Sequence, residues 1–319
     1  MRHHVWSGTL IAFAITLAAA VGTARAQTDL TRTSAGIYRL DKDSTFQRGC
    51  FEPCLCPILA EVQVRGTFNL IPTGFDGLYQ NYRITDINWT VSLGDPELRI
   101  TGSGTYRVGG EFAIRQQLSL ELLVGDGPVQ KFDSGLVAPG AEFPSLSATI
   151  SVNKIYCFDT VIVVNASPVP LAEIRPYRLL RDSSFQRGCF GICDCLLGEP
   201  QPLLGTFTLV NLRQDPLFSE FAVVDVEWAT TSGLDPAGTS IPIRGFGIYK
   251  HGGEVALVER LSLDLTVDGE PQTHYDSGLV PAGAAFPRID TSLSINNLIC
   301  YDTRIHVDAW PQRRLRRRF

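Results

Sequence analysis

Eight cysteines form the strongest chemical pattern in this 319-residue chain, in two sets with nearly the same spacing. Thiolates in a C-x3-C-x-C arrangement with one distant partner can bind a metal ion or pair as disulfides. An oxidising compartment favours disulfides, and the sequence around the first set has no histidine to complete a mixed metal site. We therefore expect two disulfides in each set: Cys50, Cys54, Cys56 and Cys157, and Cys189, Cys193, Cys195 and Cys300.

The connectivity within each set is open, since four cysteines allow three pairings. A bridge between Cys54 and Cys56 would be strained, because one intervening residue rarely permits disulfide geometry. We expect one local bridge from Cys50 and one long bridge to Cys157. In the chain-entropy model a bridge closing about 100 residues contributes roughly 4–5 kcal/mol to stability.

Histidine and acidic residues offer weaker candidates for catalysis. His251 and His274 have no histidine counterpart in the first part of the chain, where Val108 and Lys131 stand instead. A mechanism that needs histidine could therefore operate only in the second part, with Asp276 as an acidic partner. Four acids recur in both parts and could form a glycosidase pair or a calcium site, although no EF-hand pattern supports calcium. They are Asp86/Asp225, Glu111/Glu254, Asp133/Asp276 and Asp159/Asp302.

Arg48 and Arg187 precede the first cysteine of each set, within a shared Gln-Arg-Gly sequence. A guanidinium at a matched position could hold an anionic ligand. It could equally brace a carboxylate within the fold, such as Asp159. We expect the structural role and keep both arginines as weak site candidates.

The N-terminus predicts export. A short basic start is followed by an apolar run over residues 6–22 and by Ala24-Arg25-Ala26, a small-x-small cleavage pattern. We expect a cleaved signal peptide over residues 1–26, a short segment over 27–36 and a secreted or periplasmic protein. The alternative is an uncleaved membrane anchor. We expect no transmembrane anchor in the mature chain, and the net charge of −5 argues against a nucleic-acid partner.

Matched sequence words indicate an internal repeat. Ser44-Thr45-Phe46-Gln47-Arg48-Gly49-Cys50-Phe51 recurs 139 residues later with Ser184 in place of Thr45, and Asp133-Ser134-Gly135-Leu136-Val137 recurs 143 residues later. The increase of the offset from 139 to 143 places a four-residue insertion in the second copy, within residues 231–239. The expected organisation is a first β domain over 37–165, a proline-rich linker over 166–176, a second β domain over 177–310 and a basic tail over 311–319.

The elements that carry these residues are predicted to be strands. Leu118, Leu120 and Leu122 alternate with polar residues, which gives a strand with one buried face. Gly109-Gly110 between two strand-like runs is typical of a tight hairpin. We expect an all-β fold with two tandem homologous antiparallel domains, each a sandwich or barrel-like and each with two disulfides.

The repeat, the expected disulfides and the lack of a catalytic set shared by both copies favour a non-enzymatic binding or structural role. The expected partner is an extracellular ligand or an envelope component, and no cofactor is indicated. Two alternatives remain: a carbohydrate-active hydrolase whose site lies in the second copy, and an envelope protein stabilised by calcium.

Overall fold

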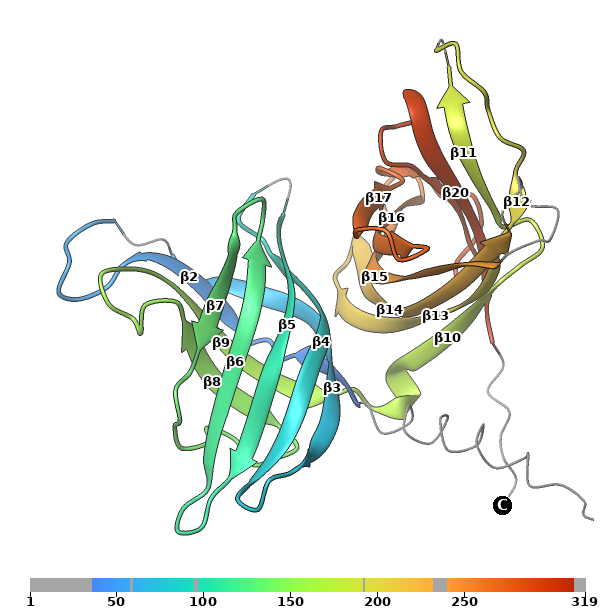
Figure 1. The fold of residues 1–319 in the computed structure, drawn as a ribbon. Helices are drawn as coiled ribbons and strands as arrows, with labels where there is room; N and C mark the ends of the chain where they lie inside the picture. Colours follow the sequence, from blue (N-terminus) through green and yellow to red (C-terminus); the bar gives the residue numbers. More distant parts are fainter. Residues whose placement is uncertain (1–35, 58–59, 95–96, 192, 232–239, 313–319) are drawn as a thin grey trace, which may run out of the picture. The chain divides into compact units, whose positions relative to one another are not determined.

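The computed structural model describes residues 36–312 except 58–59, 95–96, 192 and 232–239. Most of this backbone is β-strand, arranged in two large antiparallel sheets (Figure 1). The one helical element among the described residues is a 3-10 turn at Leu171–Glu173. No helix in this part of the chain is long and apolar enough to span a membrane. The predicted all-β class is confirmed. The predicted signal peptide and residues 313–319 of the basic tail lie outside the described part.

The first sheet contains nine strands in the order β1-β3-β2-β9-β8-β7-β6-β5-β4. Additional pairing of β3 with β4 closes the sheet into a barrel-like ring. Its strands are β1 Gly36–Leu40, β2 Thr45–Cys50, β3 Val62–Phe75, β4 Tyr79–Val91, β5 Leu98–Gly109, β6 Arg115–Val124, β7 Val129–Asp133, β8 Leu146–Ser151 and β9 Phe158–Pro168.

The second sheet contains eleven strands, and its main path is β12-β11-β20-β10-β13-β14-β15-β16-β17. An isolated bridge between Asp276 and Ser294 links the end of β17 to the residue after β19. Its strands are β10 Ile174–Leu179, β11 Ser184–Phe190, β12 Gln201–Pro202, β13 Leu204–Gln214, β14 Phe218–Thr231, β15 Ser240–Gly252, β16 Val258–Val267, β17 Thr273–Asp276, β18 Val280–Pro281, β19 Ile289–Leu293 and β20 Cys300–Pro311.

The leucine alternation does place one strand face in the core. Leu118, Leu120 and Leu122 of β6 are fully buried, while Ser119 and Glu121 between them point away from the core. The matched strand β16 buries its three leucines in the same way: Leu261, Leu263 and Leu265. Successive side chains of a strand point to opposite faces, so this period of two produces a half-buried strand.

The same aromatic packing organises both cores. The Phe68 ring stacks on one aromatic ring and meets the Trp89 ring edge-on, with centroids 6.2 Å apart. Phe207 and Trp228 repeat this arrangement at 6.0 Å. Edge-to-face rings at this separation contribute about 0.5–1.5 kcal/mol beyond their burial. Each sheet therefore encloses its own hydrophobic core.

Two elements differ from the expected ones. The hairpin at the glycine pair is wider than predicted, because β5 ends at Gly109 and β6 begins at Arg115, so residues 110–114 form the turn. Of the predicted linker over 166–176, only residues 169–173 lie outside strands. Most of the predicted insertion, residues 232–239, lies outside the described part.

Candidate functional site

The cysteines pair identically in the two halves. The local bridges are Cys50–Cys56 and Cys189–Cys195, each with a sequence separation of 6. The long bridges are Cys54–Cys157, with a separation of 103, and Cys193–Cys300, with a separation of 107. The expected local bridge from Cys50 and long bridge to Cys157 are both confirmed, and no described cysteine is free.

Each long bridge fixes a loop that leads into the last long strand of its sheet. We call residues 152–158 the first cystine loop and residues 295–301 the second. In the first loop the buried Asp159 carboxylate accepts four backbone N–H hydrogen bonds. The donors are Val152 at 3.1 Å, Asn153 at 3.0 Å, Ile155 at 2.7 Å and Thr160 at 2.7 Å.

The second cystine loop repeats this arrangement around Asp302. Its carboxylate accepts hydrogen bonds from the backbone N–H groups of four residues: Ile295 at 3.0 Å, Asn296 at 3.0 Å, Leu298 at 2.8 Å and Thr303 at 2.6 Å. A buried carboxylate with this many N–H partners is well satisfied and holds the loop backbone in one conformation. The sequence did contain a signal for this role, since an aspartate lies two residues after the last cysteine in both sets.

The backbone of these loops occupies the left-handed region at non-glycine residues. Lys154, Ile155 and Cys157 have φ of 58°, 58° and 52°. The matched residues Asn297, Leu298 and Cys300 have φ of 54°, 58° and 61°. Such residues, and a β-branched isoleucine above all, are strained unless the surrounding structure dictates them. Here the disulfide and the aspartate carboxylate supply that constraint.

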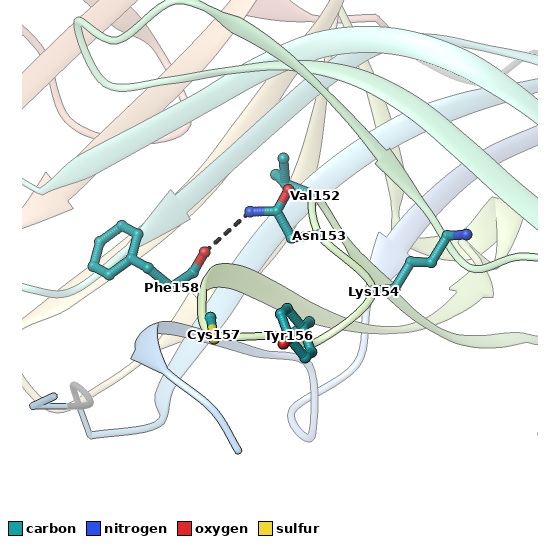
Figure 2. Close-up of a pocket in the computed structure, with 6 residues that line it drawn as sticks. All are labelled: Val152, Asn153, Lys154, Tyr156, Cys157 and Phe158. Carbon is teal, nitrogen blue, oxygen red and sulfur yellow. Dashed lines mark hydrogen bonds between the residues drawn. The ribbon is translucent and has the colours of Figure 1, made fainter. Parts of the chain in front are cut away.

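An open concavity of about 620 Å³ lies at the first cystine loop (Figure 2). Its lining contains neither a carboxylate nor a histidine: Val152, Asn153, Lys154, Tyr156, Cys157 and Phe158. The Asn153 side chain donates a hydrogen bond to the Phe158 carbonyl at 3.0 Å, which ties the two ends of the loop. Tyr156 and Phe158 are 60 % and 55 % exposed. This set can bind an apolar or stacking group, with the amine of Lys154 and the phenol of Tyr156 as polar groups beside it.

Arg48 lies beside this concavity. Its guanidinium carbon is 5.7 Å from the centroid of the Phe158 ring, which is cation–π distance. The Asp159 carboxylate, named above as an example of a group that Arg48 could brace, accepts hydrogen bonds from four backbone N–H groups. Arg187 differs again: it lies over the Phe185 ring, donates to Thr303 Oγ1 at 3.2 Å and approaches Glu270 at 3.5 Å.

Two of the candidate residues of the second half, His274 and Asp276, lie together in a different cluster. Strand register pairs Asp264 with His274 and Ser262 with Asp276 on β16 and β17. His274 Nδ1 lies 2.7 Å from Asp264 Oδ1, and Nε2 lies 3.3 Å from Ser262 Oγ and 3.8 Å from Asp276. Sequence reasoning singled out His274 and Asp276. It missed Ser262 and Asp264, because their neighbourhood depends on the register between two strands.

The spacing of this cluster resembles a serine–histidine–aspartate relay, but its charges do not. Hydrogen bonds to Asp264, and then to Asp276, raise the pKa of His274 to about 9. Burial opposes ionisation of Asp276, yet hydrogen bonds with His274 and Arg260 hold its pKa below the usual range. At neutral pH His274 is therefore an imidazolium, which cannot accept the proton of a serine hydroxyl. The cluster acts as an ion-pair network at that pH.

His251 belongs to neither cluster. Its ring packs 5.3 Å from the Phe286 ring and 6.3 Å from the Tyr249 ring. The matched Phe143 packs on Tyr82 and Tyr106 in the first half. His251 thus occupies a stack of rings.

A buried carboxyl beneath that stack was not expected. Glu259 is fully buried; Oε2 accepts a hydrogen bond from Tyr249 Oη at 2.8 Å and Oε1 accepts one from the Gly283 N–H at 3.0 Å. Burial raises its pKa. The first half has Gln116 at the matched position, where it accepts from Tyr106 Oη at 3.1 Å. The first half therefore keeps the position neutral with an amide.

No group of three or more potential ligands among the described residues is arranged to hold a metal ion. Comparison of the chain with protein-family models, with curated proteins and with solved structures gives no significant match in any of the three.

Proposed function

We propose that this chain is an exported binding protein, built from two homologous β domains that each present a cystine loop to a ligand. The single observation that carries the proposal is the exposure of apolar rings on a loop backbone held by both a disulfide and a buried carboxylate. The disulfides support an oxidising compartment, reached through the predicted signal peptide. The shared words along the sequence support duplication of one ancestral domain.

Rigid loops of this kind favour binding, since little conformational freedom is lost when a ligand is bound. Tyr156 and Phe158 of the first loop correspond to Ile299 and Tyr301 of the second, which are also largely exposed. Exposed rings beside amide and cationic groups suit a ligand with flat apolar faces and polar edges. The sugar rings of a polysaccharide have that chemistry, and two loops on one chain can add avidity when both engage a polymer.

A pull-down on insoluble polysaccharides tests this proposal. We expect the purified protein to sediment with at least one of cellulose, chitin or peptidoglycan. Replacing Tyr156→Ala and Phe158→Ala together with Ile299→Ala and Tyr301→Ala should reduce binding by about tenfold or more. The control is Val129→Ala, an exposed apolar change on β7. Absence of binding to all three polymers, or equal binding by the loop variant, would contradict the proposal.

The second candidate function is a hydrolase in the second half, favoured by the 3.3 Å approach of Ser262 Oγ to His274 Nε2. Because His274 is charged until pH about 9, activity by this route would rise only in alkaline solution. Turnover of aryl esters or polysaccharides that increases toward pH 10 and is abolished by Ser262→Ala would establish it. A lack of turnover across that range would exclude this site as a hydrolase.

A further inference from the structure

Each half also exposes a second apolar feature, at the turns that join β3 to β4 and β5 to β6, at the segment that follows β7, and at the matched segments of the second half. Phe112 and Val255, at matched positions, are 96 % and 97 % exposed. We call the exposed apolar residues of these segments the first tip and the second tip. The first tip is Leu78, Phe112, Ile114 and Leu136, and the second tip is Leu217, Val255, Leu257 and Leu279.

The residues of each tip come from neighbouring turns. In the first half the Gly110 N–H donates to the Leu78 carbonyl at 3.1 Å, which joins the two hairpins (Figure 1). Gln116 pairs with Val137, which brings the segment containing Leu136 to the same end of the sheet. In the second half the Gly253 N–H donates to the Leu217 carbonyl at 2.8 Å, and the Ala282 N–H donates to the Leu257 carbonyl at 3.0 Å.

The turn at each tip is tightly folded. Gly110 and Gly253 have φ of 139° and 130°, and a Cβ on either would lie 2.1 Å from a backbone carbonyl oxygen. Phe112 and Val255 follow these glycines, at the apex of a turn that closes within five residues. Each tip is therefore a narrow protrusion whose apical side chain is directed away from its own core.

The two tips share apolar character, and both have leucine at two matched positions, but the other two matched pairs differ in side-chain shape. An aromatic ring in the first tip corresponds to a β-branched valine in the second, and Ile114 corresponds to Leu257. A rigid protein pocket selects a particular shape, because a close-packed contact is sensitive to single methylene groups. A fluid hydrocarbon phase selects only for apolar area. The tips therefore suit a fluid hydrocarbon phase better than a rigid protein pocket.

The charged residues at the tips indicate which lipid headgroups the tips suit. Both tips carry an exposed glutamate beside the apical residue, Glu111 and Glu254, and an aspartate in the neighbouring turn, Asp76 and Asp215. Basic side chains lie near these acids in similar number: Arg115 and Arg107, which lies 4.9 Å over the Tyr79 ring, in the first half, and Arg213 and Lys250, which lies 4.4 Å over the Phe218 ring, in the second. Neither tip has the cluster of basic residues that attracts a protein to anionic membranes.

We infer that the two tips insert their apolar side chains into the interface of a zwitterionic phospholipid bilayer. This inference is independent of the cystine loops, because it uses other residues and another class of ligand. Insertion would anchor the protein peripherally, with Phe112 and Val255 at acyl-chain depth and the acidic residues at the headgroups. Since the attraction is apolar, salt should weaken it little.

Vesicle flotation with the full-length mature protein tests the inference. We expect the protein to float with phosphatidylcholine vesicles, equally at low and high salt, and less well when phosphatidylglycerol is added. The variant Phe112→Ser, Ile114→Ser, Val255→Ser, Leu257→Ser should float at least about tenfold less. A Phe112→Trp reporter should show a blue-shifted emission with vesicles and quenching by brominated acyl chains.

The cystine-loop variant at Tyr156, Phe158, Ile299 and Tyr301 removes a comparable apolar area elsewhere and serves as the matched control, which should float as the wild type does. The inference is overturned if the wild-type protein fails to float, or if the tip variant floats equally well. It is also overturned if the tip changes convert an oligomer to a monomer without any vesicle binding by the wild type. That last result would identify the tips as a self-association surface. Failure of polysaccharide binding would leave this inference standing.

Discussion

The Asp159 carboxylate accepts a 2.7 Å hydrogen bond from the backbone N–H of Ile155, a β-branched residue in the left-handed region. We predict that Asp159→Asn costs about 2–3 kcal/mol, because an amide leaves several buried N–H donors without an anionic acceptor. Urea unfolding of the oxidised protein measures this cost. Asp126→Asn, at an exposed turn, is the control and should change stability by less than about 0.5 kcal/mol. Equal midpoints for the two variants would show that the carboxylate does not hold the loop.

Glu259 should make the stability of the second half depend on pH. The first half lacks this dependence, because the matched residue is Gln116. Burial raises the pKa of Glu259 above its ordinary value of 4.5. The folded state therefore favours the protonated acid, so this stabilisation is fully present below pH 4.5 and is lost as the pH rises through the folded-state pKa. Glu259→Gln should gain stability relative to wild type by about 1.4 kcal/mol for each pH unit of that shift. Thermal unfolding of both proteins at pH 4 and pH 8 checks this trend. A stability difference between variant and wild type that is the same at both pH values would refute it.

His274 should stabilise the second half in a different pH window. Its pKa is raised from 6.5 to about 9, so its contribution is complete below pH 6.5 and disappears as the pH rises through 9. The site is partly exposed, so we expect the loss to be about 1 kcal/mol. His274→Lys introduces the residue found at the matched position, Lys131, and should keep its charge across this window. Denaturation at pH 6 and pH 9.5 should show a drop for wild type only. A drop of equal size in the variant would place the titrating group elsewhere.

The two disulfides of the first half should differ in how much each contributes to stability. In the chain-entropy model, loss of Cys54–Cys157 costs about 4–5 kcal/mol, whereas loss of Cys50–Cys56 costs only about 2 kcal/mol because its loop is short. The paired variants Cys54→Ala, Cys157→Ala and Cys50→Ala, Cys56→Ala test this by chemical denaturation. The reverse order of stability would mean that the short bridge supports the cystine loop more than the long one. A thiol assay on the unfolded wild-type protein should detect no free cysteine among the eight.

Periodicity was sufficient to predict the strands and the fold class. The alternation of Leu118, Leu120 and Leu122 depends only on the two faces of a strand, which is local information. The cysteine pairing was partly within reach, because the short separation disfavours Cys54–Cys56 and leaves two of the three pairings, between which the sequence does not choose.

The functional features depend on contacts between distant segments. Phe112 follows a glycine pair and reads as the start of a strand, but β6 begins only at Arg115. Where a strand resumes after a turn depends on register with its neighbours, so the exposure of Phe112 was not predictable. The proximity of Ser262 to His274 depends on the same kind of information. Asp159 was noted as a matched acid and as a possible partner of Arg48, because nothing local shows which donors its carboxylate would meet.

The Cys54–Cys157 bridge spans every turn from β3 to β8. A protease that cuts any exposed turn in this interval, including the turn at Phe112, produces two polypeptides that remain covalently joined. Cys193–Cys300 protects the second half in the same way. A nicked molecule would thus run at full size on a gel without reductant and release fragments only when reduced. In an oxidising compartment, where the bridges persist, such a chain can be cleaved and still remain one molecule.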